Sequence, residues 1–221
     1  MAESKFIFHY LDLTARGEVT RLTLAAAGKE YEDARIPFEE IAQQRHRFPF
    51  EQVPVLEIDG KMYTQSFAIN CYIAKEFGIY GDNNLERLLI DQVLLLIKSI
   101  FDTASHFLSE KDPAKKVAKV KEFKMNTCLP TYRKLEKLLE QNGTGYFAGN
   151  RLSVAEIAVY DVTTTTLQFV IVPIDGKFPL LQANLRKTAE FPEIKAYMAT
   201  RKNQHFPVSQ QPQVPPSTKT A

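Results

Sequence analysis

The pattern of hydrophobic and polar residues changes character part-way along the chain. The first 80 residues alternate short apolar runs with segments of helical periodicity, which predicts strands and helices in turn. Lys5–Leu11 alternates less regularly than a half-exposed strand would, so we expect it to be buried on both faces. The order strand–helix–strand, then strand–strand–helix, predicts a mixed sheet. We expect strands at 5–11, 31–36, 56–60 and 61–64, and helices at 16–27 and 65–77.

Beyond this region the pattern is helical. Gly78–Asn84 is polar and rich in turn residues, which indicates a boundary. Apolar residues then recur at helical spacing and predict a long helix over 88–108. A second helix should run over about 113–140, and Pro130 should bend or interrupt it, because proline lacks the N–H that the helix needs.

A further helix start is encoded near residue 153. Ser153 and Glu156 have the spacing of a capping box, and Leu152 and Ile157 have that of a hydrophobic staple. We interpret this segment as folding information rather than as part of a catalytic site.

The pattern divides the chain into two domains. The last segment, from Pro207, contains four prolines with many serines, glutamines and threonines, and is predicted to be disordered or extended. A partner site in this tail is the alternative. We expect an α/β domain, a linker, an all-α domain and the tail over residues 1–80, 81–86, 87–206 and 207–221.

Composition excludes several classes of function. The chain of 221 residues is 44% hydrophobic and 24% charged with a net charge of +2, which favours neither nucleic acid nor an acidic membrane as a partner. No apolar run is long enough to span a bilayer. Cys71 and Cys128 form no CxxC pair and the four histidines have no metal-ligand spacing, so we expect no metal, and a reduced, cytoplasmic protein.

The most informative segment is Val53-Pro54-Val55, followed by Gln65-Ser66. The proline precedes a short strand and an Asp59-Gly60 hairpin turn, and Gln65-Ser66 then opens a helix. A proline here can be cis, which leaves the preceding backbone amide free for a ligand. The helix N-terminus supplies amide donors and a positive dipole end that suit a carboxylate. The segment is therefore predicted to be a peptide-binding edge beside an anion-binding helix end.

These residues resemble the glutathione-binding half of the cytosolic glutathione transferases. Phe8-His9-Tyr10, Arg16–Arg21 and Gln65–Ile69 carry the resemblance, and together with Tyr31-Glu32-Asp33 they look most like the sigma class. The resemblance covers roughly 5–206 and is strongest over the first 80 residues. It implies a thioredoxin-like α/β N-terminal domain, an all-α C-terminal domain, and a homodimer in which Phe48 and Phe50 are candidate contacts.

The resemblance also implies a site. Tyr10 would be the catalytic hydroxyl and Arg16 would raise the local positive potential, although the residues alone leave open a buried structural tyrosine and a surface arginine. The glutathione-binding residues would be Tyr10, Arg16, Ile41, Arg45, Gln52, Val53, Pro54, Gln65, Ser66 and Asp102. The electrophile pocket would be lined by Leu11, Leu13, Phe101, Ser105, His106, Ala158 and Val162.

The implied chemistry is activation of a thiol. The thiol of glutathione, like that of free cysteine, has a pKa near ~8.5, so only about 3% is the reactive thiolate at neutral pH. Lowering this pKa by about 2 units requires roughly 2.7 kcal/mol of preferential stabilisation of the thiolate. A charge-assisted hydrogen bond from a hydroxyl and a nearby cation can supply it. Glutathione would be a cosubstrate, and no tightly bound cofactor is implied.

Two departures from the family pattern concern glutathione binding. The family tryptophan that grips the glycyl carboxylate is absent, Ile41 stands in its place, and Arg45 is a possible substitute. Ser99 stands where the family often has an aspartate that reaches the glutathione amine of the partner subunit, with Asp102 three residues on. We expect each lost contact to raise the Kd for glutathione by up to ~10-fold.

Three functions stay open on this evidence. The first is a transferase that conjugates glutathione to small hydrophobic electrophiles in detoxification. The second is a non-enzymatic protein of the S-crystallin kind, structural or ligand-binding, which the two departures favour. The third is a glutathione-dependent prostaglandin isomerase, which is disfavoured because Ala158 and His106 stand where those enzymes have aromatic residues.

Overall fold

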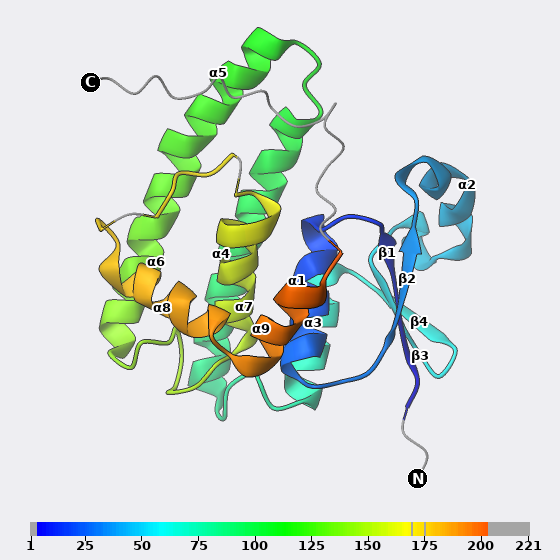
Figure 1. Cartoon of the computed structure of the whole chain (residues 1–221), viewed down its shortest axis with the longest axis horizontal. Helices are drawn as coiled ribbons and strands as arrows, with labels where there is room; N and C mark the ends of the chain where they lie inside the picture. Colours follow the sequence, from blue (N-terminus) through cyan, green and yellow to red (C-terminus); the bar gives the residue numbers. More distant parts are fainter. Residues whose placement is uncertain (1–3, 169, 175, 203–221) are drawn as a thin grey trace.

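The computed structural model describes residues 4–168, 170–174 and 176–202. Its N-terminal half is a mixed four-stranded sheet with the strand order β2-β1-β3-β4 (Figure 1). Strands β1 and β2 are parallel, whereas β3 is antiparallel to both β1 and β4. The predicted mixed sheet is thus confirmed. Its elements are β1 Phe6–Leu11, α1 Ala15–Ala26, β2 Glu32–Ile36, β3 Val55–Ile58, β4 Lys61–Thr64 and α3 Ser66–Glu76.

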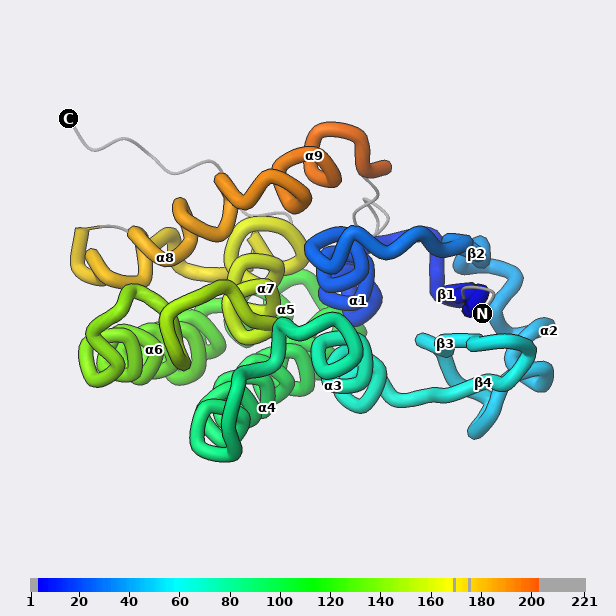
Figure 2. The backbone as a smooth tube through the Cα atoms, turned by 90° about the horizontal axis from the view of Figure 1, so that it is seen from below, coloured from blue at the N-terminus to red at the C-terminus, as the bar shows by residue number. Residues whose placement is uncertain are grey.

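Helices α1 and α3 lie on the same side of the sheet (Figure 2). Because the helices cover one face, β1 is not buried on both faces as its sequence predicted. Phe6, Phe8 and Tyr10 are buried, and the residues between them are partly exposed. His9 on the second face hydrogen-bonds with Glu57, with 2.9 Å between Nε2 and Oε2.

The connection from β2 to β3 is a series of short helical turns. These are a 3-10 turn at Phe38–Glu40, the short helix α2 at Ile41–Gln44, and 3-10 turns at Arg45–Arg47 and Pro49–Glu51. The chain then enters β3 through a cis peptide bond between Val53 and Pro54.

The β3–β4 hairpin confirms the predicted turn. Asp59 and Gly60 both have positive φ, at 49° and 81°. Two successive residues with positive φ are what a two-residue turn of type I′ requires, and Asp-Gly adopts them readily.

The C-terminal half is helical. Its elements are α4 Asn84–Leu108, α5 Pro113–Phe123, a π-helical turn at Lys124–Cys128, α6 Leu129–Asn142, α7 Val154–Asp161, a π-helical turn at Val162–Thr166, α8 Pro179–Ala189 and α9 Pro192–Thr200. Helix α4 begins within the predicted linker, because the Asn83 side chain accepts hydrogen bonds from the first free N–H groups. The predicted second long helix is interrupted one turn before Pro130, where the missing N–H disturbs the i→i−4 ladder.

Helix α7 forms the centre of the helical half. The capping box of Ser153 and Glu156 is present, and Glu156 also accepts a hydrogen bond from the main-chain N–H of Phe147. Leu152 and Ile157, the predicted staple pair, are both buried. These contacts support the interpretation of this segment as folding information.

The two halves are joined by a buried polar network. Glu18 of α1 accepts hydrogen bonds from the Tyr197 hydroxyl and from Arg201 Nη1, at 3.1 and 2.9 Å. Arg21 of α1 is fully buried and binds Asp33 on β2 at 3.1 Å. The network ties α1 to α9 and to the sheet, and so holds α1 between the two halves (Figure 2).

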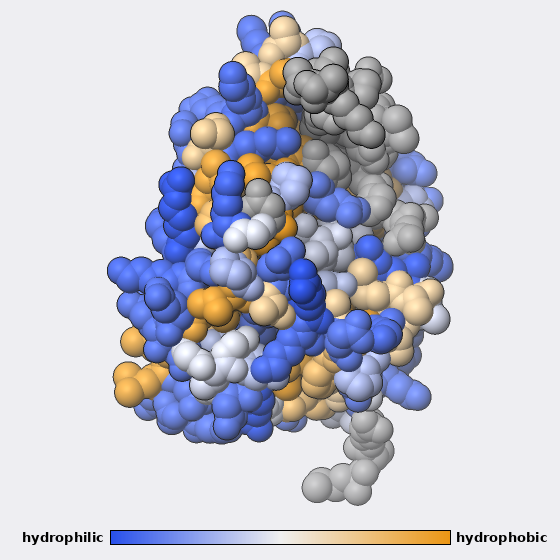
Figure 3. Space-filling model, turned by 60° about the vertical axis from the view of Figure 1, so that its left-hand side comes forward, coloured by the Kyte–Doolittle hydropathy of each residue, from blue (hydrophilic) through white to orange (hydrophobic). Residues whose placement is uncertain are grey.

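Hydrophobic residues reach the surface of the helical half. On one face they gather in a band that is bordered by hydrophilic side chains (Figure 3). Among the described residues, no helix is long and apolar enough to cross a membrane. The predicted tail at 207–221 and the end of the predicted helical domain lie outside the described residues.

Candidate active site

Tyr10 lies near the end of β1, with its hydroxyl against the first turn of α1. The main-chain N–H of Arg16 donates a hydrogen bond to this hydroxyl, with 3.2 Å between N and O. That N–H belongs to the first turn of the helix, whose donors have no partner within the helix. Ala15 directs it there from the left-handed region, with φ of 39°. Because the hydroxyl accepts from Arg16, its own O–H is available to donate to a ligand.

The surroundings of Tyr10 keep the phenol protonated. Tyr10 is only 5% exposed. Burial raises the pKa of Tyr10 to about 12, and the hydrogen bond from Arg16 and the charges of Arg21 and Arg16 offset only part of this effect. The phenol is therefore a hydrogen-bond donor at neutral pH and not a base.

Gly17 of α1 lies against the Tyr10 ring. A Cβ atom built on Gly17 would lie 2.2 Å from Cδ1 of Tyr10 and 2.7 Å from Cε1 and Cγ. The ring therefore lies where only a glycine allows it. The sequence analysis missed this residue, although a glycine early in a predicted helix is a signal of close approach because it costs helix stability.

The Arg16 side chain crosses from α1 to α4. Its Nη2 lies 2.8 Å from Oδ1 of Asp102, and its guanidinium carbon lies 5.9 Å from the centre of the Phe101 ring. The second oxygen of Asp102 accepts from Lys98 Nζ at 2.7 Å. Lys98 and Arg16 hold the pKa of Asp102 below its usual range, so the carboxylate is charged. Arg16, Asp102 and Lys98 therefore form a row of alternating charges between the two halves.

An apolar cavity of about 160 Å³ lies on one side of Arg16. Four of the seven residues predicted for a hydrophobic pocket line it, namely Leu11, Leu13, Phe101 and Ser105, together with Tyr10 and Arg16. Residues that the sequence analysis did not predict complete the lining: Ala15, Phe38, Ala104, Leu108 and Leu167. Phe38 begins a 3-10 turn and Leu167 directly follows a π-helical turn, and the periodicity of the sequence did not predict either residue in the pocket.

The other three predicted pocket residues lie elsewhere. His106 is exposed on α4 and does not line this cavity, because it lies on the solvent side of the helix. Val162 is buried in the core and does not reach the cavity either. Ala158 lines a second cavity on the other side of Arg16.

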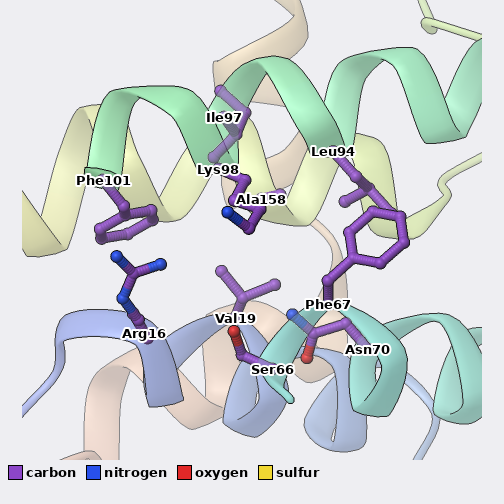
Figure 4. A pocket seen from close by; sticks show the side chains of 10 residues that line it. All are labelled: Arg16, Val19, Ser66, Phe67, Asn70, Leu94, Ile97, Lys98, Phe101 and Ala158. Atoms are coloured by element: carbon purple, nitrogen blue, oxygen red, sulfur yellow. The ribbon is translucent and has the colours of Figure 1, made fainter. Parts of the chain in front are cut away.

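The second cavity is smaller, about 40 Å³. Figure 4 shows Lys98 pointing into it from α4, opposite Ser66 at the start of α3. Gln65, just before this helix, has φ of 78°, and its side chain approaches Gln52 at 3.4 Å. The full lining is Arg16, Val19, Ser66, Phe67, Asn70, Leu94, Ile97, Lys98, Phe101 and Ala158. Arg16 and Phe101 line both cavities and so separate them.

Metal ligands are not grouped in the part of the chain that the structure describes. Within it, no cluster of three or more histidine, cysteine, aspartate or glutamate side chains is placed to hold an ion. Cys71 and Cys128 are free and buried.

Comparison with known proteins identifies the family. A family model described as the N-terminal domain of glutathione S-transferase matches residues 8–75, and one for the C-terminal domain matches residues 99–201. The S-crystallin SL11 of Nototodarus sloanii is 32% identical over 204 residues, which cover 91% of this chain and 98% of the relative. The chain belongs to the glutathione S-transferase family. Glutathione S-transferase 2 of Manduca sexta is 30% identical over 203 residues, covering 91% of this chain and 99% of that protein.

A solved structure agrees with this glutathione S-transferase fold. The structure of prostaglandin synthase D of Nilaparvata lugens superposes with a TM-score of 0.80 at 29% identity. The match covers 90% of this chain and 98% of that chain. The predicted fold, a thioredoxin-like α/β domain followed by a helical domain, is confirmed.

The residues expected to bind the glycyl end of glutathione lie around α2. Ile41 is partly buried and packs against Ile36, Phe48 and Val55. The Arg45 side chain is 60% exposed, and its Nε lies 4.0 Å from a carboxylate oxygen of Glu51. Gln52 is exposed, and Val53 is partly buried beside the cis bond to Pro54.

Proposed function

We propose that this glutathione S-transferase binds glutathione between its two halves and activates the thiol for attack on small hydrophobic electrophiles. The observation that carries the proposal is the position of Tyr10 and Arg16. The protonated phenol, the guanidinium and an apolar cavity adjoin one another, and the Ser66 helix end lies beyond Arg16. The sigma-like motifs at Tyr10 and Gln65-Ser66 support the same assignment.

Catalysis would be stabilisation of the thiolate. The Tyr10 O–H would donate a hydrogen bond to the sulfur, and a bond to a charged acceptor contributes about 1.5–3 kcal/mol. This covers most or all of the roughly 2.7 kcal/mol that a drop of 2 units in the thiol pKa requires. The Arg16 charge would add to it. The electrophile in the adjacent cavity would then be held near the nucleophile.

We propose that glutathione lies beside the segment that leads into β3, at Val53 and Pro54. The main chain of Val53 would pair with the cysteinyl backbone, since this requires no particular side chain. The start of α3 at Gln65 and Ser66 would bind the γ-glutamyl carboxylate through its free N–H groups and the dipole. Arg45, with Gln52 and Ile41, would lie at the glycyl end.

The apolar cavity supports a small hydrophobic electrophile. Its volume of about 160 Å³ suits one aromatic ring or a short acyl chain more than a long lipid, and Tyr10, Arg16 and Ser105 are its polar members. A halogenated aromatic compound or a lipid-derived enal fits this description, as expected in cytosolic detoxification. Prostaglandin isomerisation is a weaker candidate for so small a cavity, although a prostaglandin synthase shares the fold.

We also propose a homodimer. Phe50, in the turn before β3, is 73% exposed, which is unusual for so large an apolar side chain. Leu95 is also exposed, and it lines a groove between α4 and α6. A two-fold arrangement could place the apolar side chain of each subunit on the apolar surface of the other.

A structural role of the S-crystallin kind is the main alternative, since the S-crystallin SL11 is among the relatives. A protein without turnover has no need for a protonated phenol that lines a cavity beside Arg16. The arrangement around Tyr10 therefore favours the enzyme.

Replacing Tyr10 by phenylalanine tests the proposed function. We expect kcat for conjugation of chlorodinitrobenzene to fall about 10- to 150-fold, equivalent to 1.5–3 kcal/mol, while the Kd for glutathione from calorimetry changes little. Tyr63→Phe is the matched control, because Tyr63 is an exposed tyrosine on β4. Absence of glutathione binding at millimolar concentration in the unmodified protein would refute the enzyme and support the crystallin-like alternative.

A further inference from the structure

Lys98 of α4 lines the small cavity on the Ser66 side, and Asp102 is its ion-pair partner on the same helix. Lys98 Nζ lies 2.7 Å from one oxygen of Asp102, and Arg16 Nη2 lies 2.8 Å from the other. The Lys98 side chain is 49% exposed, so the ammonium can reach a ligand as well as Asp102. The three groups together carry a net charge of +1.

Asp102 is not available as a free counter-charge. Both carboxylate oxygens already have a cationic partner in the same chain. An ammonium group of a ligand would have to displace Lys98 or Arg16 from Asp102. A single carboxylate that already has two cationic partners gives little further stabilisation to a third one. The expectation that Asp102 binds the glutathione amine is therefore not favoured by this geometry.

The small cavity on the Ser66 side has a positive lining. Lys98 and Arg16 are its charged members, and none of the described residues that line it carries a carboxylate (Figure 4). Its amide side chain, Asn70, accepts a hydrogen bond from Thr20 at 2.7 Å. Ser66, the first residue of α3, adds its hydroxyl and the positive end of a helix of 11 residues. Every charge that faces the cavity therefore attracts an anion and repels a cation.

We propose that Lys98 is a specificity-determining residue which, with Ser66, makes this site recognise the carboxylate of the γ-glutamyl group and disregard its amine. The inference rests on the proposed glutathione site. Its consequence is a wider range of thiol cosubstrates, because tripeptides whose γ-glutamyl amine is absent or acylated keep the group that is recognised. The amine contributes to neither binding nor turnover in this chain.

Two glutathione analogues separate the contributions of the carboxylate and the amine. Glutaryl-cysteinyl-glycine keeps the carboxylate and lacks the amine, and 4-aminobutanoyl-cysteinyl-glycine keeps the amine and lacks the carboxylate. We expect the first analogue to have a Kd and a kcat/KM within about 3-fold of those of glutathione, and the second to be weaker by about 10-fold or more, the loss of one charged hydrogen bond.

Variants of Lys98 assign this selectivity to one side chain. Lys98→Ala should raise the Kd for glutathione and for the glutaryl analogue about 3- to 10-fold, leave the aminobutanoyl analogue nearly unchanged, and so narrow the difference between the analogues. Lys98→Arg should retain the selectivity, because it keeps the charge. Arg87→Ala is the matched control: Arg87 is an exposed cation near the start of the same helix and does not line the cavity.

The outcomes distinguish this inference from the proposed function. If the unmodified protein binds no glutathione in calorimetry, the proposed function fails and the inference fails with it. If glutathione binds but the glutaryl analogue is more than 10-fold weaker, or Lys98→Ala weakens all three ligands equally, the glutathione site stands and the role of Lys98 is refuted. Thermal unfolding of each variant verifies that a weakened ligand does not reflect a misfolded protein.

Discussion

Gly17→Ala should reduce catalysis without preventing the fold. The new methyl group would lie 2.2 Å from Cδ1 of Tyr10, where carbon atoms in contact are about 3.5–4.0 Å apart. The ring must therefore move by more than about 1 Å. The ring has little freedom to move. It stacks on Phe8 with ring centres 6.1 Å apart, and the guanidinium carbon of Arg21 lies 5.7 Å from the centre of the Tyr10 ring.

Two effects on stability oppose each other in this variant. Alanine favours a helix over glycine by about 1 kcal/mol. Inserting a methyl group into a packed site costs about 1–3 kcal/mol. The free energy of unfolding should therefore fall by between about zero and 2 kcal/mol, and the variant should still fold. The larger effect should fall on the position of the Tyr10 hydroxyl.

Displacing the hydroxyl removes its hydrogen bond to the thiolate. A loss of about 1.5–3 kcal/mol corresponds to a fall in kcat/KM of about 10- to 150-fold. The pKa of the bound thiol should rise towards the ~8.5 of a free thiol. Ultraviolet absorbance of the thiolate, followed over pH with glutathione bound, measures that pKa directly.

The control for Gly17→Ala is Gly176→Ala, which adds a methyl group where no atom lies within 4 Å. It should leave kcat/KM and the thiol pKa unchanged. The reasoning would be refuted if Gly17→Ala kept kcat/KM within 2-fold and titrated like the unmodified protein. A protein that lost stability but kept its thiol pKa would show that Gly17 serves packing alone.

Two further predictions concern pH and association. Burial, with Glu18 nearby, raises the pKa of Asp161 to about 7 from an ordinary 3.8, so the folded state keeps a proton that the unfolded chain releases between about pH 4 and 7. The free energy of unfolding should fall by up to about 4 kcal/mol as pH rises through this window. Asp161→Asn should reduce the difference in the free energy of unfolding between pH 5 and pH 8, measured by urea denaturation. The same difference in the variant and in the unmodified protein would contradict this prediction. Phe50→Ser should raise the dimer Kd about 100-fold or more in sedimentation velocity, since two buried phenylalanines contribute about 1.5–3 kcal/mol each. Leu180→Ser is the control and should leave the dimer Kd unchanged, because Leu180 is an exposed apolar residue elsewhere on the surface. Equal effects of the two variants on the dimer Kd would argue against this interface.

Local signals predicted much of the fold. The Asp59-Gly60 turn, the start of α3 at Ser66 and the capping box at Ser153 all depend on interactions within a few residues. The burial of β1 was predicted wrongly, because coverage of its second face depends on where distant segments pack. The π-helical turn before Pro130 was not predicted either, because the sequence indicated an interruption of the helix but not its form.

The candidate site was predicted most fully where its residues belong to a contiguous motif, although Phe101 and Ser105 of α4 were also predicted to line the cavity. Tyr10 and Arg16 are six residues apart, and their hydrogen bond follows from the turn between β1 and α1. Lys98 is different. The role that we propose for it depends on α4 lying beside α1 and α3, so that a lysine of the helical half and Ser66 line the same cavity.

The contacts that decide how Asp102 can act arise between α1 and α4 and within α4. A substitution at Ser99 looks, in sequence, like the loss of an acidic contact to the glutathione amine. In the structure, Asp102 is one turn away but is held by Arg16 and Lys98, which makes it part of the scaffold that positions Arg16. The same carboxylate cannot both neutralise these cations and serve as a free partner for an ammonium group. The proposed selectivity would therefore follow from keeping Arg16 in place, and it is compatible with the activation of the thiol that we propose for Tyr10.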